Sequence, residues 1–327
     1  MHRIKLAILV TLLLLGSVMA GSAQTGDRLT VILDFFVNPS QWPLFVAEAQ
    51  GFFADVGLDV DIQEPADPSD PPQLAATGRV DLALTTSFDL VIQRDRGLNL
   101  TAVGSLIQSP LGGLLSLRSN GIETLADLRG KTIGFALEPE EPALWTAMMR
   151  SVGVEPGEYE LVNIGFDGIP LLLAGQVDAI AGFRNFEPIL LELDGADVVF
   201  FPFEDHGIPS SWQLVFSSNA ATIENKGDEI SRFLQAVQRA VEFTLQNPNG
   251  ALNDFFELNP TLAADDQREL NIRSALATLL LYQGAPCHND VETWTQLQDF
   301  IFDQNLIESK AELSDLFRTD FLPSVCF

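Results

Sequence analysis

Short apolar segments alternate with longer amphipathic stretches through roughly the first two thirds of this 327-residue chain. Apolar runs of about four to eight residues are typical of buried strands, and longer amphipathic stretches are typical of helices. The alternation predicts an α/β fold with mainly parallel sheets and helices on their faces. We expect strands at 29–33, 58–62, 82–85, 102–107, 114–117, 132–135, 160–163, 179–183, 198–201 and 213–217. From about residue 225 onward the periodicity is helical only.

Length and an internal repeat predict two lobes. Without an N-terminal leader roughly 300 residues remain, which exceeds what one hydrophobic core usually serves. A Gly-x-Val-Asp pattern followed by two apolar residues begins at Gly78 and again at Gly175, and it indicates two similarly built α/β units. We expect two chain crossovers, with lobe 1 formed by 27–117 plus 218–327, lobe 2 by 118–217, and a ligand cleft between them.

The first 23 residues have the features of a secretory signal peptide. Arg3 and Lys5 precede an apolar run at 6–15, and small residues around Ala20 and Ala23 offer cleavage sites. The apolar run is too short for a membrane-spanning helix. We therefore expect an exported mature protein.

Charge argues against several kinds of partner. The chain has 45 acidic and 18 basic residues, a formal net charge of −27. This charge argues against binding of nucleic acid or of an anionic membrane, and it disfavours a strongly anionic ligand. After removal of the leader only His206 and His288 remain, and no metal-binding spacing is present, so we expect no metal and no cofactor.

Both cysteines, Cys287 and Cys326, lie near the C-terminus. In an oxidising compartment they would form one disulfide that fixes the C-terminal tail. Two unpaired thiols are the alternative.

The residues that follow the first strand suit a flat, nitrogen-rich ring. Asp34, Phe35, Phe36 and Asn38 come directly after the apolar run 29–33. Ligands of open α/β sheets bind outside the carboxyl ends of the strands. A carboxylate, aromatic faces and an amide at that place would bind such a ring. The alternative is a proline turn whose Phe side chains lie in the core.

Several motifs resemble those of the substrate-binding proteins of ABC importers. They are Gly51-Phe52-Phe53, Gly57-Leu58-Asp59-Val60, the two Gly-x-Val-Asp copies and Leu125-x-Asp127-Leu128-x-Gly130-Lys131. The resemblance extends over nearly all of the chain after the leader. It implies the two-lobed periplasmic binding protein fold, a periplasmic location, a monomer, a small-molecule ligand and an ABC permease of the inner membrane as partner.

The segment that begins at Asp34 resembles the branch that binds thiamin pyrimidine precursors. In that branch a Trp stands in place of Phe35, a Pro in place of Val37 and often a His in place of Gln41. Phe35 keeps an aromatic face, whereas Gln41 changes the hydrogen bonding. The resemblance implies ligand contacts from Asp34, Phe35, Phe36, Asn38 and Gln41.

A second segment, 182–188, is similar to an Asn-x-Glu segment of the same branch and implies contacts from Phe183, Asn185 and Glu187. Glu187 follows a strand, as Asp34 does, so the two acids would face each other across the cleft. A carboxylate accepts hydrogen bonds from an exocyclic amine. The alternative for Glu187 is an acid stabilised by the helix dipole.

Three further residues are weaker candidates. Ser87 lies at a strand end, where its hydroxyl would bind a ligand or form part of a helix cap. Glu140 belongs to an acidic run at 138–142, which suits an amine better than an anion; the alternative is a solvated helix start. Trp212 lies near the second crossover and would stack on a ligand.

The segment 64–70 is also similar to part of a fungal-type enzyme, hydroxymethylpyrimidine phosphate synthase. That enzyme requires a lysine that holds pyridoxal phosphate, whereas this chain has Thr85, which cannot form a Schiff base. The Cys-rich iron-binding segment of the enzyme is missing too. We expect no catalytic residues, but a binding protein for a small aromatic heterocycle, a thiamin pyrimidine precursor. A sulfonate, nitrate or riboflavin-like solute is the alternative.

Overall fold

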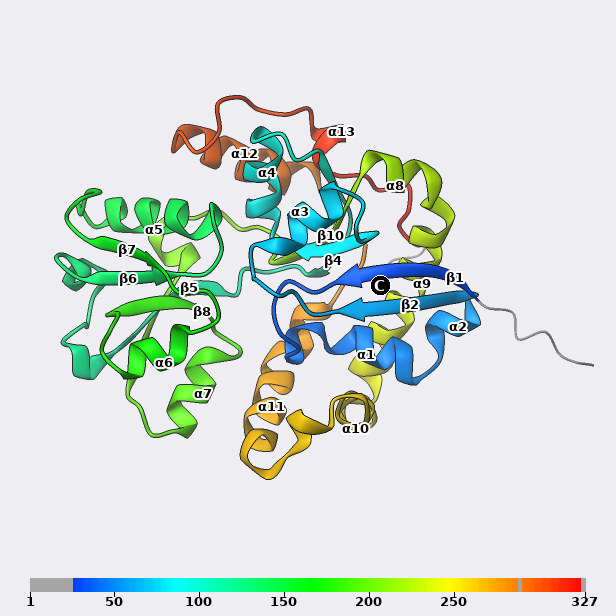
Figure 1. Cartoon of the computed structure of the whole chain (residues 1–327), viewed down its shortest axis with the longest axis horizontal. Coiled ribbons are helices and arrows are strands. Elements are labelled where there is room, and N and C mark those ends of the chain that lie inside the picture. The colour runs from blue at the N-terminus through cyan, green and yellow to red at the C-terminus, as the bar shows by residue number, and fades with distance from the viewer. Residues whose placement is uncertain (1–25, 288–289, 325–327) are drawn as a thin grey trace, which may run out of the picture.

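The computed structural model describes residues 26–287 and 290–324. The chain forms two five-stranded sheets, each flanked by helices, in two lobes (Figure 1). The expected signal peptide at 1–23 and the expected disulfide partner Cys326 lie outside the described residues. In the part of the chain that is described, no helix is long and apolar enough to cross a membrane.

The sheet of lobe 1 combines parallel and antiparallel pairs. Its strands are β1 (Asp27–Ile32), β2 (Leu58–Gln63), β3 (Leu82–Thr85), β4 (Leu100–Ile107) and β10 (Leu214–Asn219), in the order β2-β1-β3-β10-β4. Strand β1 pairs in parallel with β2 and β3, whereas β10 runs antiparallel to β3 and β4. Leu29, Val31 and Leu33 are fully buried, which explains the apolar first run.

The sheet of lobe 2 has the equivalent topology. Its strands are β5 (Gly112–Leu117), β6 (Thr132–Phe135), β7 (Glu160–Asn163), β8 (Ala179–Phe183) and β9 (Val198–Pro202), in the order β7-β6-β8-β5-β9. Strand β6 pairs in parallel with β7 and β8, and β5 runs antiparallel to β8 and β9. In each sheet one strand, β10 or β5, occupies the equivalent position between two antiparallel neighbours, and only β10 returns to its sheet after the intervening lobe.

Helices fill the connections, and the C-terminal part is helical, as its periodicity predicts. The helices before β5 are α1 (Trp42–Ala49), α2 (Phe52–Asp55), α3 (Asp70–Ala76) and α4 (Ser87–Asp95). Those of lobe 2 are α5 (Glu140–Ser151), α6 (Gly168–Leu173) and α7 (Glu187–Leu193). After β10 follow α8 (Ala220–Asn225), α9 (Gly227–Gln246), α10 (Pro248–Leu258), α11 (Asp265–Thr278), α12 (Val291–Asp303) and α13 (Leu313–Leu316).

The chain passes between the sheets at 108–111 and at 203–213. Strand β5 therefore belongs to the sheet of lobe 2 and β10 to that of lobe 1, which corrects our division of the chain at 117 and 217. Apolar runs predict strands, but they do not say which of two sheets a strand joins. Gln213 connects the two crossovers, because its Oε1 accepts hydrogen bonds from the backbone N–H groups of Leu111 (2.7 Å) and Gly112 (3.2 Å).

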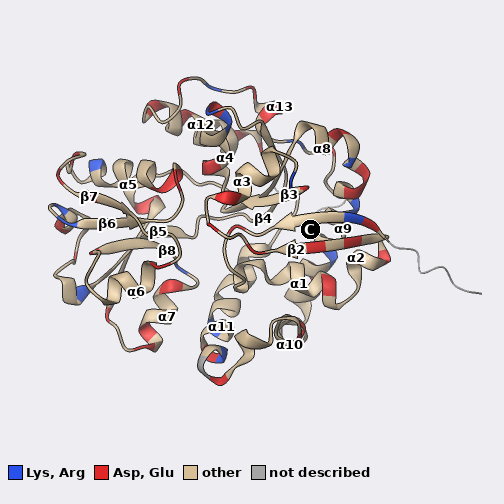
Figure 2. Ribbon diagram, viewed as in Figure 1, with Lys and Arg blue, Asp and Glu red and all other residues tan. Residues whose placement is uncertain are grey.

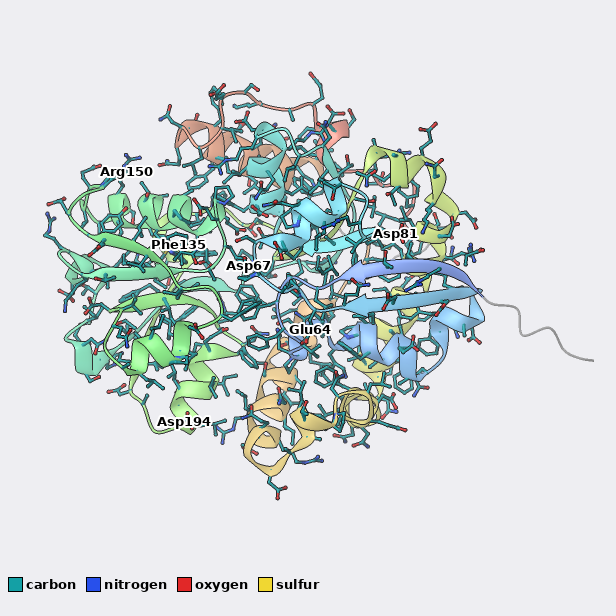
Figure 3. All side chains as sticks on the ribbon, viewed as in Figure 1. Glu64, Asp67, Asp81, Phe135, Arg150 and Asp194 are labelled. Carbon is teal, nitrogen blue, oxygen red and sulfur yellow. The ribbon has the colours of Figure 1, made fainter. Side chains whose placement is uncertain are left out.

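The two Gly-x-Val-Asp copies make the same local structure in both lobes. Asp81 Oδ2 accepts a hydrogen bond from the N–H of Thr30 at 2.8 Å, and Asp178 Oδ2 accepts one from the N–H of Thr132 at 2.9 Å. Each aspartate thus joins the turn before β3 or β8 to the neighbouring strand β1 or β6. The repeat in the sequence reflects two equivalent βαβ units, and Figure 3 labels Asp81 in the first.

Acidic side chains outnumber basic ones on both lobes (Figure 2). Many of the basic groups are already paired with acids at the surface. Arg232 contacts Asp27 and Asp228, and Arg239 contacts Asp55. Exposed pairs of this kind contribute little stability, about 0–1 kcal/mol each. The excess of acid therefore remains as a negative field around the molecule.

Candidate ligand-binding site

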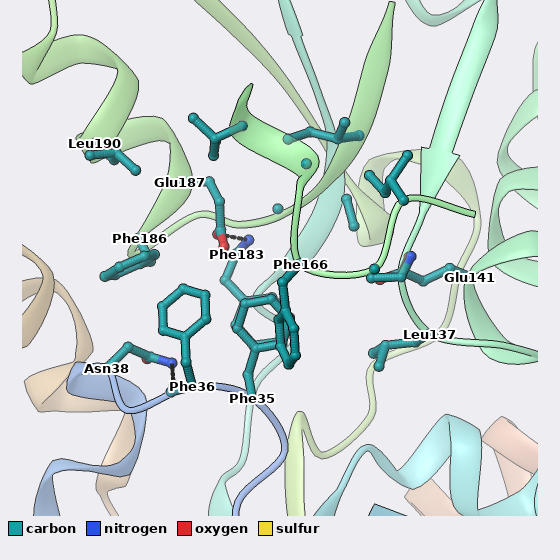
Figure 4. Close-up of a pocket in the computed structure, with 18 of the residues that line it drawn as sticks. Phe35, Phe36, Asn38, Leu137, Glu141, Phe166, Phe183, Phe186, Glu187 and Leu190 are labelled. Carbon is teal, nitrogen blue, oxygen red and sulfur yellow. Dashed lines mark hydrogen bonds between the residues drawn. The ribbon is translucent and has the colours of Figure 1, made fainter. Parts of the chain in front are cut away.

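A cavity of about 350 Å³ lies between the lobes (Figure 4). Lobe 1 contributes Asp34, Phe35, Phe36 and Asn38, just after β1. Lobe 2 contributes residues that follow β6 and β7, in the ranges 136–141 and 164–170, and residues within and after β8, in the range 180–190. All these segments lie at or just after the carboxyl ends of parallel strands, where open α/β sheets place their ligands.

Phenylalanine rings from the two lobes meet in this cavity. The ring centroid of Phe35 lies 4.7 Å from that of Phe166, in an edge-to-face arrangement. Phe36 lies 5.9 Å from Phe186, also edge to face. Phe36 is 36% exposed and Phe166 37% exposed, so each offers ring surface to a bound molecule. The cavity is therefore suited to a flat apolar ring.

Three carboxyl groups line the same cavity, and each accepts hydrogen bonds from the protein. Gln41 Nε2 donates to Asp34 Oδ1 at 2.8 Å. The backbone N–H of Ala136 donates to Glu141 Oε2 at 2.6 Å, and that of Phe183 to Glu187 Oε2 at 2.7 Å. An ionised carboxylate can accept about four hydrogen bonds. The three groups therefore keep capacity for donors of a ligand.

Removal from water raises the pKa of each of these carboxyl groups. The pKa of Asp34 rises to about 6, although the hydrogen bond from Gln41 opposes the shift. Burial raises the pKa of Glu187 to about 7, and the charge of Asp34 adds to it. Burial also raises the pKa of Glu141 to about 7, with a further contribution from Glu187. No Lys, Arg or His lines the cavity among the described residues, so its electrostatic character is negative.

A network of hydrogen bonds orders the segment after β1. Asn38 Oδ1 accepts from the N–H of Ser40 at 2.8 Å, and Asn38 Nδ2 donates to the carbonyl of Phe36 at 3.0 Å. Gln41 Oε1 accepts from the N–H of Asn38 at 2.9 Å. Glu64, labelled in Figure 3, accepts from the N–H of Val37 at 2.6 Å. Gln41 itself is fully buried and does not line the cavity, so it positions Asp34 instead of facing a ligand.

Of the residues that the sequence indicates, six line the cavity, namely Asp34, Phe35, Phe36, Asn38, Phe183 and Glu187. Asn185 lies outside it and connects the lobes, because its Nδ2 donates to Thr278 Oγ1 at 2.7 Å and to Ser40 Oγ at 3.2 Å. Ser87 is buried and donates to the carbonyl of Trp212 at 2.9 Å.

Two further candidates also lie away from the main cavity. Trp212 packs in the core with its ring centroid 5.0 Å from that of Trp294. Glu140 accepts a hydrogen bond from Thr86 Oγ1 at 2.5 Å, a contact between the lobes. Its neighbour Glu141 lines the cavity in its place. Adjacent residues of a helix point about 100° apart, and the acidic run alone does not say which of them faces the cleft.

Glu141, Phe166 and Phe186 line the cavity but were not among our candidates. Phe166 had a usable signal, because it is an aromatic residue three positions after the end of β7. Phe186 lies within the segment 182–188 that we singled out, and Glu141 lies within the acidic run 138–142. Two of these three residues therefore lie in segments that the sequence singles out, whereas the segment that contains Phe166 was not singled out.

The family of the chain follows from a match to a known family model, described as NMT1/THI5 like, over residues 38–251. The chain belongs to this NMT1/THI5-like family. A thiamine biosynthesis protein of Haemophilus influenzae is 35% identical over 291 residues, which cover 88% of this chain and 91% of the relative. A formylaminopyrimidine-binding protein of Halalkalibacterium halodurans is 30% identical over 323 residues, which cover 96% and 97%.

Solved structures show the same fold for this NMT1/THI5-like protein. The alkanesulfonate-binding protein SsuA of Xanthomonas axonopodis pv. citri superposes with a TM-score of 0.71 at 16% identity, over 89% of this chain and 98% of that chain. At this identity the likeness concerns the fold alone. It confirms the two-lobed periplasmic binding protein fold that the motifs imply.

Enzymes occur among the relatives as well. A 4-amino-5-hydroxymethyl-2-methylpyrimidine phosphate synthase of Legionella pneumophila is 25% identical over 300 residues, which cover 91% of this chain and 93% of the enzyme. In this NMT1/THI5-like protein, Thr85 is buried at the end of β3 and donates to Ser217 Oγ at 3.1 Å. Thr85 is not among the residues that line the cavity.

Proposed function

We propose that this protein captures a thiamin pyrimidine precursor outside the cytoplasm and delivers it to an ABC permease of the inner membrane. The observation that carries the proposal is the cavity lined by phenylalanine rings and by three carboxyl groups, with no basic residue among the described residues that line it. The name of the relative from Halalkalibacterium halodurans supports the same ligand class.

An aminopyrimidine matches this cavity chemically. Its ring is flat and would pack against Phe35, Phe36 and Phe166, where an aromatic pair contributes about 0.5–1.5 kcal/mol beyond area burial. Its exocyclic amine donates to Glu187 or Asp34, and its ring nitrogen becomes a donor when it is protonated. Because the pKa of Glu187 is about 7, this carboxyl group can give or take that proton near neutral pH.

Other solutes match less well. A sulfonate or nitrate would meet three acids and no basic partner, although a cavity for an oxyanion needs donors or positive charge. A riboflavin-like solute would need more room, because about 350 Å³ is near the lower end of the range of ligand pockets, which is about 300–1,000 Å³.

We propose further that the protein binds its ligand without chemical turnover and that it acts as a monomer. Thr85 cannot form the Schiff base that the synthase-type reaction requires. The signal-like sequence at 1–23 supports export to the periplasm.

A thermal-shift screen of the mature protein tests the proposal. The compounds are hydroxymethyl- and formylaminomethyl-pyrimidines, thiamin, riboflavin, taurine and nitrate. A ligand at about a hundred times its Kd stabilises the native state by about 2.7 kcal/mol, which is a measurable shift. We expect a shift with a pyrimidine. A shift with taurine, nitrate or riboflavin and none with a pyrimidine would overturn the ligand assignment.

A further inference from the structure

Glu141 is the one acid of the cavity that no ligand contact proposed so far involves. It lies in the first turn of α5, is 7% exposed, and accepts hydrogen bonds from the backbone N–H groups of Ala136, at 2.6 Å, and of Leu137. Figure 4 shows Glu141 and Glu187 on opposite sides of the cavity, whose wall also contains the rings of Phe35, Phe36 and Phe166. The cavity therefore has two acidic ends that are separated by an apolar, aromatic middle.

The surroundings of Glu141 are unfavourable for a carboxylate charge. Leu137 lies beside it on the cavity wall, and no basic side chain lines the cavity among the described residues. A buried carboxylate needs hydrogen-bond donors or an opposite charge, since leaving it unpaired costs several kcal/mol. The backbone donors satisfy part of this requirement for Glu141, and a ligand whose amine contacts Asp34 and Glu187 at one end leaves Glu141 without an opposite charge.

We propose that Glu141 binds a second nitrogen-bearing group, an amine or ammonium on the substituent of the ring, and thereby determines which precursor is taken. This inference rests on the proposed function and narrows the class of ligand that the protein binds. It assigns the ligand two nitrogen donors at opposite ends of a flat ring. An ammonium is preferred to a hydroxyl at such a place, because a charge-assisted hydrogen bond is about twice as strong as a neutral one.

The experiment compares two ligands that differ only in one group. Titration calorimetry at pH 7.5 measures the affinity of the mature protein for 4-amino-5-aminomethyl-2-methylpyrimidine and for the 5-hydroxymethyl compound. We expect the aminomethyl compound to bind the native protein about tenfold more tightly or better. In Glu141→Gln this preference should fall below about threefold, through loss of affinity for the aminomethyl compound alone.

Glu140→Gln is the matched control. It changes the adjacent residue of the same helix, which bonds to Thr86 and does not line the main cavity. This variant should keep the tenfold preference, and any effect on closure of the lobes should change both affinities by the same factor.

Two results would overturn the inference while the proposed function stands. One is equal binding of both pyrimidines by the native protein, a comparison that requires no variant to fold. The other is an unchanged preference, or an equal loss for both ligands, in a Glu141→Gln protein with a native melting curve. If the native protein binds neither pyrimidine, the proposed function fails and the inference fails with it.

Discussion

At the scale of single residues, the carboxyl groups of the cavity should matter more for affinity than the aromatic rings do. A hydrogen bond to a charged group contributes about 1.5–3 kcal/mol, and an aromatic pair about 0.5–1.5 kcal/mol. We expect Glu187→Gln to weaken pyrimidine binding about tenfold to a hundredfold, and Phe36→Leu about twofold to tenfold. Titration calorimetry measures both. Glu192→Gln, an exposed acid on the same helix α7, should leave the affinity unchanged.

A larger loss in the Phe36→Leu protein than in Glu187→Gln would contradict this ranking. It would show that ring packing, and not the acids, holds the ligand.

The raised pKa of Glu141 also predicts how stability depends on pH. Burial moves its pKa from 4.5 to about 7, so between these values the folded protein binds a proton that the unfolded chain does not. The free energy of unfolding should therefore be larger at pH 5.5 than at pH 8. Urea denaturation at the two pH values measures it.

Glu141→Gln should reduce that difference by roughly 1–3 kcal/mol, because glutamine does not titrate. Asp34 and Glu187, whose pKa values are raised as well, titrate in both proteins, so the difference between the two proteins reports on Glu141 and its interaction with Glu187. The same difference in both proteins would show that Glu141 titrates normally.

The sequence located the site better than it located the side chains. Asp34 was identifiable because it follows an apolar run, and ligands of open α/β sheets bind outside the carboxyl ends of the strands, whereas Glu187 was indicated by the resemblance of the segment 182–188. Which of Glu140 and Glu141 faces the cavity was not predictable from the sequence, because it depends on how α5 packs between the lobes. Trp212 was assigned to a ligand because of its place near a crossover, whereas tertiary packing puts it against Trp294.

Among the secondary-structure elements, the N-terminus of α4 has a capping residue that also contacts the other lobe. Thr86 Oγ1 accepts from the N–H of Asp89 at 2.9 Å and donates to Glu140. Thr86→Val keeps the shape and removes both bonds. We expect it to lower the free energy of unfolding by about 1–3 kcal/mol in urea denaturation. Thr86→Ser keeps the hydroxyl and should lose much less; a loss in Thr86→Ser as large as that in Thr86→Val would contradict the dominant role of the hydroxyl.

The strand pattern was predictable because buried strands require continuous apolar runs. Every segment that we expected as a strand overlaps one of β1 to β10, and β3, β6, β7 and β8 have the expected bounds. Sheet membership was not predictable for β5 and β10. Both strands are buried along their whole length, and such a run pairs equally well at either sheet until the crossovers are placed.

At the scale of the whole molecule, the disulfide between Cys287 and Cys326 remains a prediction. Cys287 Sγ lies 3.9 Å from the carbonyl oxygen of Pro323, so the C-terminal tail passes beside it. Thiol titration of the denatured, unreduced protein should find no free thiol. Cys287→Ser should then lower the free energy of unfolding by roughly 2–4 kcal/mol. Two titratable thiols would contradict the prediction.

Gln213 holds the two crossovers together by accepting hydrogen bonds from the backbone N–H groups of Leu111 and Gly112. It places the entry to lobe 2 and the exit from it side by side, so the segment between the crossovers is a domain inserted into lobe 1 through two neighbouring connections. This insert contains Glu141, Phe166 and Glu187, whereas Asp34 to Asn38 belong to its host. Most of the residues that line the cavity therefore lie on one continuous segment, from Ala136 to Leu190. We expect that exchanging this segment between relatives, through two adjacent joints, would transfer most of the cavity wall in one step.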